Sequence, residues 1–197
     1  MQRRTLLTHC AATATAATLG GTALRAHAQA TAPSANAPNR PPAYVADALP
    51  GAIFSGSARL RFFGFDVYDS SLWVAPDFKA ANYGQSALIL ELSYLRSLDG
   101  RAIAKRSISE MRRAGPITPE QEQRWLSAMQ QSIPDVKVGD RITGVHNPVS
   151  GARFWFNGLA RAPIHDAEFS RLFFGIWLSP ATSEPALRSA LLTNAPA

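Results

Sequence analysis

The chain has 197 residues, of which 46% are hydrophobic, and its 20 basic and 14 acidic side chains give a formal net charge of +6. This composition is typical of a globular protein with a core of its own and excludes a fibrous or fully disordered chain. Basic pairs at Lys105–Arg106 and Arg112–Arg113 fit a solvated helix face. Aromatic residues do not interleave with them, so a nucleic-acid-binding surface is not predicted.

The first 28 residues have the layout of an export signal. Arg3 and Arg4 form a basic start, an Ala/Thr/Leu stretch follows, and the A-H-A motif at residues 26–28 predicts cleavage after Ala28. The apolar stretch falls short of the about 20 residues that a transmembrane helix needs. Arg3 and Arg4 fit a twin-arginine signal, and an ordinary secretory signal is the alternative. Either route predicts a periplasmic protein.

Removal of this signal changes the charge and the cysteine content. Residues 1–28 hold three of the 20 basic residues and none of the 14 acidic ones, so the net charge falls to +3. Cys10, the only cysteine, is removed with the signal and follows no lipobox, so neither a disulfide nor lipid anchoring is predicted. Residues 29–48, rich in Pro and Ala, predict a disordered lead-in. We therefore expect one domain over residues 49–197.

Three strands are predicted at the start of this domain. Residues 51–74 are rich in aromatic and β-branched residues and predict two strands, with Gly64 as a bend or bulge. Residues 87–95 alternate leucines and Tyr94 with smaller or more polar neighbours, which is the pattern of a half-buried strand.

The hydrophobic period then changes to that of helices. Asp99 is a candidate N-cap and Gly115 a stop signal for a first helix. A second helix is predicted to begin at Pro119, because Thr118 and Gln121 have the spacing of a capping box.

The remaining elements repeat this order. Residues 140–148 and 152–158 predict two strands, and a helix is predicted between Asp166, its N-cap, and Pro180. Its FFGIWL stretch is apolar nearly all round, so the helix must be buried, and Gly175 lets another segment approach. Ser183 is a candidate cap for a final short helix. Strands and helices in this order predict an α+β domain with helices packed on an antiparallel sheet.

Several motifs, in this order, resemble the chalcone isomerase-like family and specifically its bacterial exported members. They are VYDSSLWV at 67–74, the central pair of helices, WFNG at 155–158 and DAEFSRLFFGIWLSP at 166–180. The resemblance covers residues 49–192. It implies an open-faced β-sandwich, an antiparallel sheet covered by a layer of helices. The family includes plant enzymes that close chalcones into flavanones and non-catalytic relatives that bind fatty acids.

Most donor residues of the plant enzymes are missing here. Those enzymes resemble one another in an early-strand arginine, a threonine on the next strand and a tyrosine in the helical segment. Arg59 matches the arginine, but Phe62 or Phe63 stands at the threonine position. Residues 96–153 contain no tyrosine, and Gln121 or Glu122 stands where the family's tyrosine would be. Because cyclisation needs donors that stabilise the developing enolate, we predict no plant-type isomerase activity and no catalytic residue.

The fatty-acid-binding relatives hold a carboxylate with an early-strand arginine and the tyrosine of a V-Y pair. Arg59 and Tyr68 match these positions, and Arg61 is a rival because the spacing is shorter here. An arginine holds a carboxylate with two parallel hydrogen bonds. On one continuous strand Arg59 and Tyr68 would face opposite sides, so both line a pocket only if the Gly64 bend resets the alternation. Otherwise Arg59 is a surface residue and Tyr68 a core aromatic.

No metal site or cofactor is predicted, because His146 and His165 lack metal-ligand spacing and the chain has no glycine-rich phosphate loop. The sequence thus predicts an exported, non-catalytic protein that binds a fatty acid or a similar small amphipathic acid between sheet and helices. Two alternatives stay open: a structural or interaction protein whose cleft is filled, and an isomerase (intramolecular lyase) with an unknown substrate.

Overall fold

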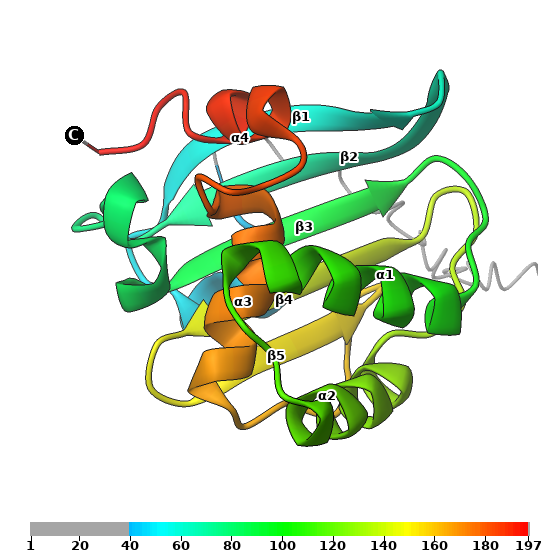
Figure 1. The fold of residues 1–197 in the computed structure, drawn as a ribbon. Coiled ribbons are helices and arrows are strands. Elements are labelled where there is room, and N and C mark those ends of the chain that lie inside the picture. The colour runs from blue at the N-terminus through cyan, green and yellow to red at the C-terminus, as the bar shows by residue number, and fades with distance from the viewer. Residues whose placement is uncertain (1–39, 197) are drawn as a thin grey trace, which may run out of the picture. The chain divides into compact units, whose positions relative to one another are not determined.

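An antiparallel sheet of six strands forms the frame of residues 40–196, the part of the chain that the computed structural model describes. Each strand pairs with the next one in the chain (Figure 1). The strands are β1 (Ile53–Phe62), β2 (Phe65–Val74), β3 (Leu88–Tyr94), β4 (Arg141–Asn147), β5 (Gly151–Phe156) and β6 (Leu159–Ala160). The five predicted strands are confirmed, and β6 is an addition. Gly64 lies in the turn that joins β1 to β2 and not in a bulge.

Four α-helices of the described chain lie on one side of this sheet (Figure 1). They are α1 (Gly100–Ala114), α2 (Pro119–Ser132), α3 (Ala167–Leu178) and α4 (Pro185–Leu191). The predicted starts of the first three are confirmed. The Asp99 carboxylate accepts from an N–H at the start of α1, and Thr118 and Gln121 form the capping box of α2. Asp166 Oδ1 accepts from the Phe169 N–H at 2.9 Å at the start of α3.

The start of α4 differs from the prediction. Glu184 is the residue before the helix and makes no side-chain cap, and Pro185 occupies the first turn. Ser183 instead donates its hydroxyl to Oε2 of Glu110 on α1 at 2.8 Å. The serine therefore links the segment before α4 to α1 and does not cap α4.

Helix α3 lies at the centre of the core between sheet and helices. Phe169, Leu172, Phe174 and Leu178 are fully buried, and the predicted burial of the FFGIWL segment is confirmed except at Ile176, which is half-buried. An added Cβ at Gly175 would lie 2.9 Å from the Cβ of Ala114 on α1, so glycine is what lets these two helices approach.

A buried hydrogen-bonded pair joins α3 to the sheet. His146 lies on β4, within the strand predicted over residues 140–148, and has no exposed surface. Its Nδ1 is 2.6 Å from Oγ of Ser170, and its Nε2 is 3.1 Å from the carbonyl oxygen of Gly84. Burial lowers the pKa of His146 below its ordinary value, so the neutral ring is the form that the fold favours.

The other face of the sheet is partly covered by the segment before β1. The 3-10 helix η1 (Ala43–Ala48) inserts Val45 into a small apolar cluster with Trp73 and Trp155. The Tyr44 hydroxyl donates to Oε2 of the buried Glu91 at 3.0 Å, and burial raises the pKa of Tyr44 to about 12. The predicted disorder is therefore wrong for residues 43–48, because apolar side chains find a surface to cover there.

The predicted export signal, residues 1–28, and the lead-in up to residue 39 lie outside the described residues. Within residues 40–196, none of the helices combines the length and the apolar character that crossing a bilayer requires.

Candidate ligand-binding site

A cavity of about 340 Å³ lies between the sheet and the helices that cover it. Its wall is formed by strands β1 to β4 on one side and by α1, α3 and the start of α4 on the other. Most of the lining is apolar and includes Leu60, Leu92, Ile103, Ile142, Phe173 and Leu187. The cleft that one alternative required to be filled is therefore open in this structure.

Two tyrosines place their hydroxyls in this apolar wall. Tyr68 on β2 and Tyr94 on β3 are cross-strand partners, and their rings meet edge to face with centroids 5.9 Å apart. The Trp177 indole N–H donates to the Tyr68 oxygen at 3.0 Å. The Tyr94 side chain is 3% exposed, and its hydroxyl has no hydrogen-bond partner among residues 40–196.

Both phenols remain protonated. Burial raises the pKa of Tyr68 and of Tyr94 well above the ordinary value, and the nearby Glu184 and Glu110 raise that of Tyr68 further. A neutral phenol in an apolar wall is a hydrogen-bond donor, and a ligand oxygen that enters the cavity can accept from it.

Four charged residues also line the cavity: the exposed Arg96 and Arg106, which mark its mouth, and the half-buried Glu110 and Glu184. Arg106 donates to Oε1 of Glu110 at 2.7 Å, so its charge is already paired. Arg96 has no carboxylate partner within residues 40–196, and its guanidinium lies over the Phe65 ring, 5.0 Å from the centroid. Arg96 is thus the cation at the mouth that is free to bind an anion.

The structure places only one of the three predicted site residues in the cavity. Tyr68 lines it, whereas Arg59 and Arg61 point to the opposite face of the sheet. Arg59 donates to Oδ1 of Asp69 at 2.6 Å and to Oδ2 of Asp66 at 2.8 Å. These hydrogen bonds, first that to Asp69, raise the pKa of Arg59 above its ordinary value. Arg61 donates to the same Asp66 at 2.7 Å. The predicted pairing of Arg59, or of Arg61, with Tyr68 does not form.

A one-residue bulge is the reason. The β1–β2 hairpin begins with Phe62 opposite Phe65 and Arg61 opposite Asp66, a register that would put Arg59 opposite Tyr68 on one face. The register then shifts by one, so that Leu60 pairs with Tyr68 and Arg59 with Asp69. Such a shift moves a side chain to the other face of a sheet.

Tyr94 and Arg96 were not predicted as site residues, and the sequence held a signal only for Tyr94. Tyr94 continues the inward alternation of Leu90 and Leu92 and so was predicted on the buried face of its strand. Arg96 follows the end of β3, where strand alternation no longer applies, and only the packing of the bend after the strand brings it to the cavity.

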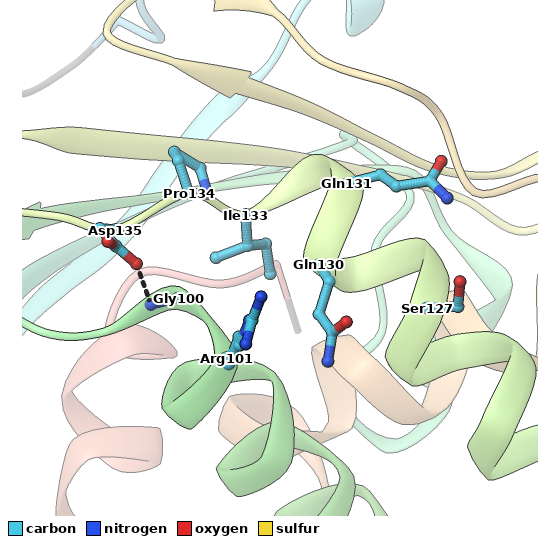
Figure 2. Close-up of a pocket in the computed structure, with 8 residues that line it drawn as sticks. All are labelled: Gly100, Arg101, Ser127, Gln130, Gln131, Ile133, Pro134 and Asp135. Carbon is cyan, nitrogen blue, oxygen red and sulfur yellow. Dashed lines mark hydrogen bonds between the residues drawn. The ribbon is translucent and has the colours of Figure 1, made fainter.

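A second hollow, of about 380 Å³, lies between the start of α1 and the end of α2 (Figure 2). Its polar side chains, among them Arg101, Ser127 and Gln130, are exposed to solvent. The Asp135 carboxylate already accepts from the Gly100 N–H at 2.8 Å, as Figure 2 shows. A solvated groove without an unpaired buried group offers little to a ligand, so the apolar cavity is the candidate site.

Comparison with known proteins identifies related sequences and a related fold. The model of the chalcone isomerase-like family matches residues 54–193. A Haemophilus influenzae protein, described only as uncharacterized, is 28% identical to this chain over 137 residues. The match covers 70% of this chain and 66% of that protein, so it spans just under two thirds of the relative's length. The crystal structure of a fatty-acid binding protein of Arabidopsis thaliana has a TM-score of 0.58 and 12% identity, covering 74% of this chain and 88% of that one. This likeness shows the fold, the predicted α+β open-faced sandwich.

Proposed function

Because this chain belongs to the chalcone isomerase-like family, we propose that it binds a small amphipathic acid, such as a fatty acid, without plant-type catalysis. The observation that supports this most is the open apolar cavity whose mouth holds the unpaired cation Arg96. Its volume of about 340 Å³ is near the lower end of the roughly 300–1,000 Å³ usual for ligand sites. A short or medium acyl chain fits this size best.

The polar groups suggest how such a ligand is oriented. The acyl chain occupies the apolar interior, and the carboxylate stays at the mouth, where Arg96 donates to it. Tyr94 supplies a second donor, since its hydroxyl has no other acceptor among the described residues. Glu110 and Glu184 also line the cavity and disfavour an anion beyond the reach of Arg96. Tyr94 and Arg96 thus replace Tyr68 and Arg59 as the proposed carboxylate contacts.

A thermal-shift experiment on the full chain with sodium dodecanoate tests the proposal. Dodecanoate is expected to raise the Tm, because it binds only the folded protein, and uncharged dodecanol is expected to raise it less. Arg96→Ala and Tyr94→Phe should each weaken apparent binding about tenfold, the equivalent of one charge-assisted hydrogen bond. Arg59→Ala and Arg61→Ala are matched controls on the opposite face and should leave the shift unchanged.

Two results would count against this assignment. If dodecanoate and shorter or longer fatty acids leave the wild-type Tm unchanged, the binding function fails. If Arg59→Ala or Arg61→Ala removes the shift while Arg96→Ala keeps it, the ligand is held on the other face of the sheet.

We also propose that this binding takes place in the periplasm. The support is the signal-like layout of residues 1–28, with its paired arginines at positions 3 and 4.

A further inference from the structure

The tip of the β1–β2 hairpin exposes three phenylalanines. The exposed fractions are 44% for Phe62, 86% for Phe63 and 61% for Phe65. The tip lies at one end of the sheet, away from the helix-covered centre (Figure 1). Clustered exposed apolar side chains are uncommon on soluble proteins and mark interaction sites.

Folding does not account for a phenylalanine at the turn. Phe63 and Gly64 both have positive φ, 48° and 79°, in a two-residue loop between Phe62 and its partner Phe65. Such turns favour Asn-Gly, and a bulky residue is strained at positive φ. The Phe63 ring contacts the Phe62 ring, with 4.5 Å between centroids, and the Phe62 ring is itself partly exposed. The turn would form more easily with asparagine at position 63.

Guanidinium groups surround these rings. Arg96 lies 5.0 Å from the Phe65 centroid and Arg106 lies 5.4 Å from the Phe62 centroid. Arg61, 69% exposed, precedes the tip on the same strand. Among the described residues, four arginines lie on the hairpin or contact its rings: Arg59, Arg61, Arg96 and Arg106. Three carboxylates, Asp66, Asp69 and Glu110, form ion pairs with them. The unpaired one is Arg96, next to the exposed rings.

The size of the patch argues against a protein partner. Given about 200 Å² for each phenylalanine side chain, the exposed parts of the three offer on the order of 400 Å². A specific protein interface needs roughly 1,000 Å² over both partners, or about 500 Å² on each side, with matching shape, and the three rings alone fall short of this. A bilayer needs no matching pocket, and apolar side chains that include phenylalanine, flanked by basic residues, are the combination by which peripheral proteins bind an anionic membrane surface.

We propose that the hairpin tip docks on the surface of an anionic phospholipid bilayer, with Phe63 and Phe65 at the level of the headgroups and Arg96 paired with a lipid phosphate. Phe62 and Arg96 also line the cavity, so docking turns the cavity mouth towards the acyl chains. This orientation would let a ligand pass between the cavity and the bilayer. Only that transfer rests on the function proposed above, and the docking itself does not.

Sedimentation with vesicles tests the docking. We compare vesicles of phosphatidylcholine with phosphatidylglycerol against vesicles of phosphatidylcholine alone, using the full chain, so that any contribution of residues 1–39 is common to all variants. The double substitution Phe63→Asn, Phe65→Ser should weaken binding to the anionic vesicles about tenfold or more, the equivalent of burying one phenylalanine. Val149→Ser is the control, since Val149 is 87% exposed in the turn at the opposite end of the sheet.

A second measurement separates docking from damage to the fold. Phe63→Asn alone should leave the Tm unchanged or raise it, because asparagine suits the turn, while it weakens vesicle binding. A loss of binding without a loss of stability is therefore the expected signature.

The proposal is overturned if the wild type does not sediment with anionic vesicles, if it sediments equally with neutral ones, or if Val149→Ser weakens binding as much as the double substitution. The dodecanoate shift separates the two proposals, because it does not depend on vesicles. If vesicle binding follows the expected pattern while dodecanoate shifts no variant, the ligand proposal fails and the docking proposal stands.

Discussion

Asp166 ties two helices and the core together, and its replacement by alanine should lower the stability more than the loss of an ordinary helix cap. Oδ1 accepts from the Phe169 N–H at 2.9 Å at the start of α3, and Oδ2 accepts from the Trp125 indole N–H at 2.8 Å. Trp125 lies on α2 and is 1% exposed, and Asp166 is the hydrogen-bond partner of its indole N–H in the folded protein. The two carboxylate oxygens therefore have separate partners, and both are lost in Asp166→Ala.

The magnitude follows from these two losses. An N-cap contributes about 1 kcal/mol, and a buried donor left unpaired costs about 1–3 kcal/mol. Asp166→Ala should then destabilise the protein by about 2–4 kcal/mol. For a domain of this size each kcal/mol shifts the Tm by roughly 2–4 °C, so a fall of about 4–16 °C is expected in calorimetry.

Two further variants divide this loss. Asp166→Asn keeps one acceptor oxygen and should lose about half as much, since its amide NH₂ cannot accept from the indole or from the Phe169 N–H. Asp99→Ala is the matched control: Asp99 caps α1 through the Ala102 N–H at 2.7 Å, and its side chain makes no second hydrogen bond within residues 40–196. Urea titration of the three variants gives the free energies. If Asp166→Ala is no more destabilising than Asp99→Ala, the bond to Trp125 does not stabilise the fold and the reasoning is refuted.

Three other predictions concern pH, catalysis and export. Burial depresses the pKa of His146, so its contribution to stability should be full above its ordinary value near 6.5 and be lost as the pH falls from there through the folded pKa; His146→Gln should flatten the unfolding free energy between pH 7.5 and 5, and an unchanged profile would contradict this. Hydroxychalcones should not be cyclised above the rate in buffer, because Phe62 or Phe63 stands at the position of the plant threonine; faster loss of chalcone absorbance would overturn this. Replacing Arg3 and Arg4 by lysine should block export if the twin-arginine route is used, and normal periplasmic accumulation of that variant would exclude the route.

Local features of the sequence predicted the elements of the fold. The helix starts at Asp99, Thr118 and Asp166 were predicted correctly, because a cap is an interaction between residues three apart that needs no other part of the chain. The burial of α3 followed from a stretch that is apolar on every side, including Phe173. The motifs that resemble the family then predicted how these elements are layered.

The tertiary structure alone decided which side chains share the cavity. A one-residue shift of register beside Val67 puts Arg59 on the far face from Tyr68, and no residue pattern in the hairpin marks where that shift occurs. Arg96 reaches the mouth through the bend after β3, and Tyr44 finds Glu91 across the sheet, 47 residues away. The physical reason is common to these cases. Caps and alternation act over a few residues, whereas strand register and the cover of a sheet face are set by competing contacts between distant segments.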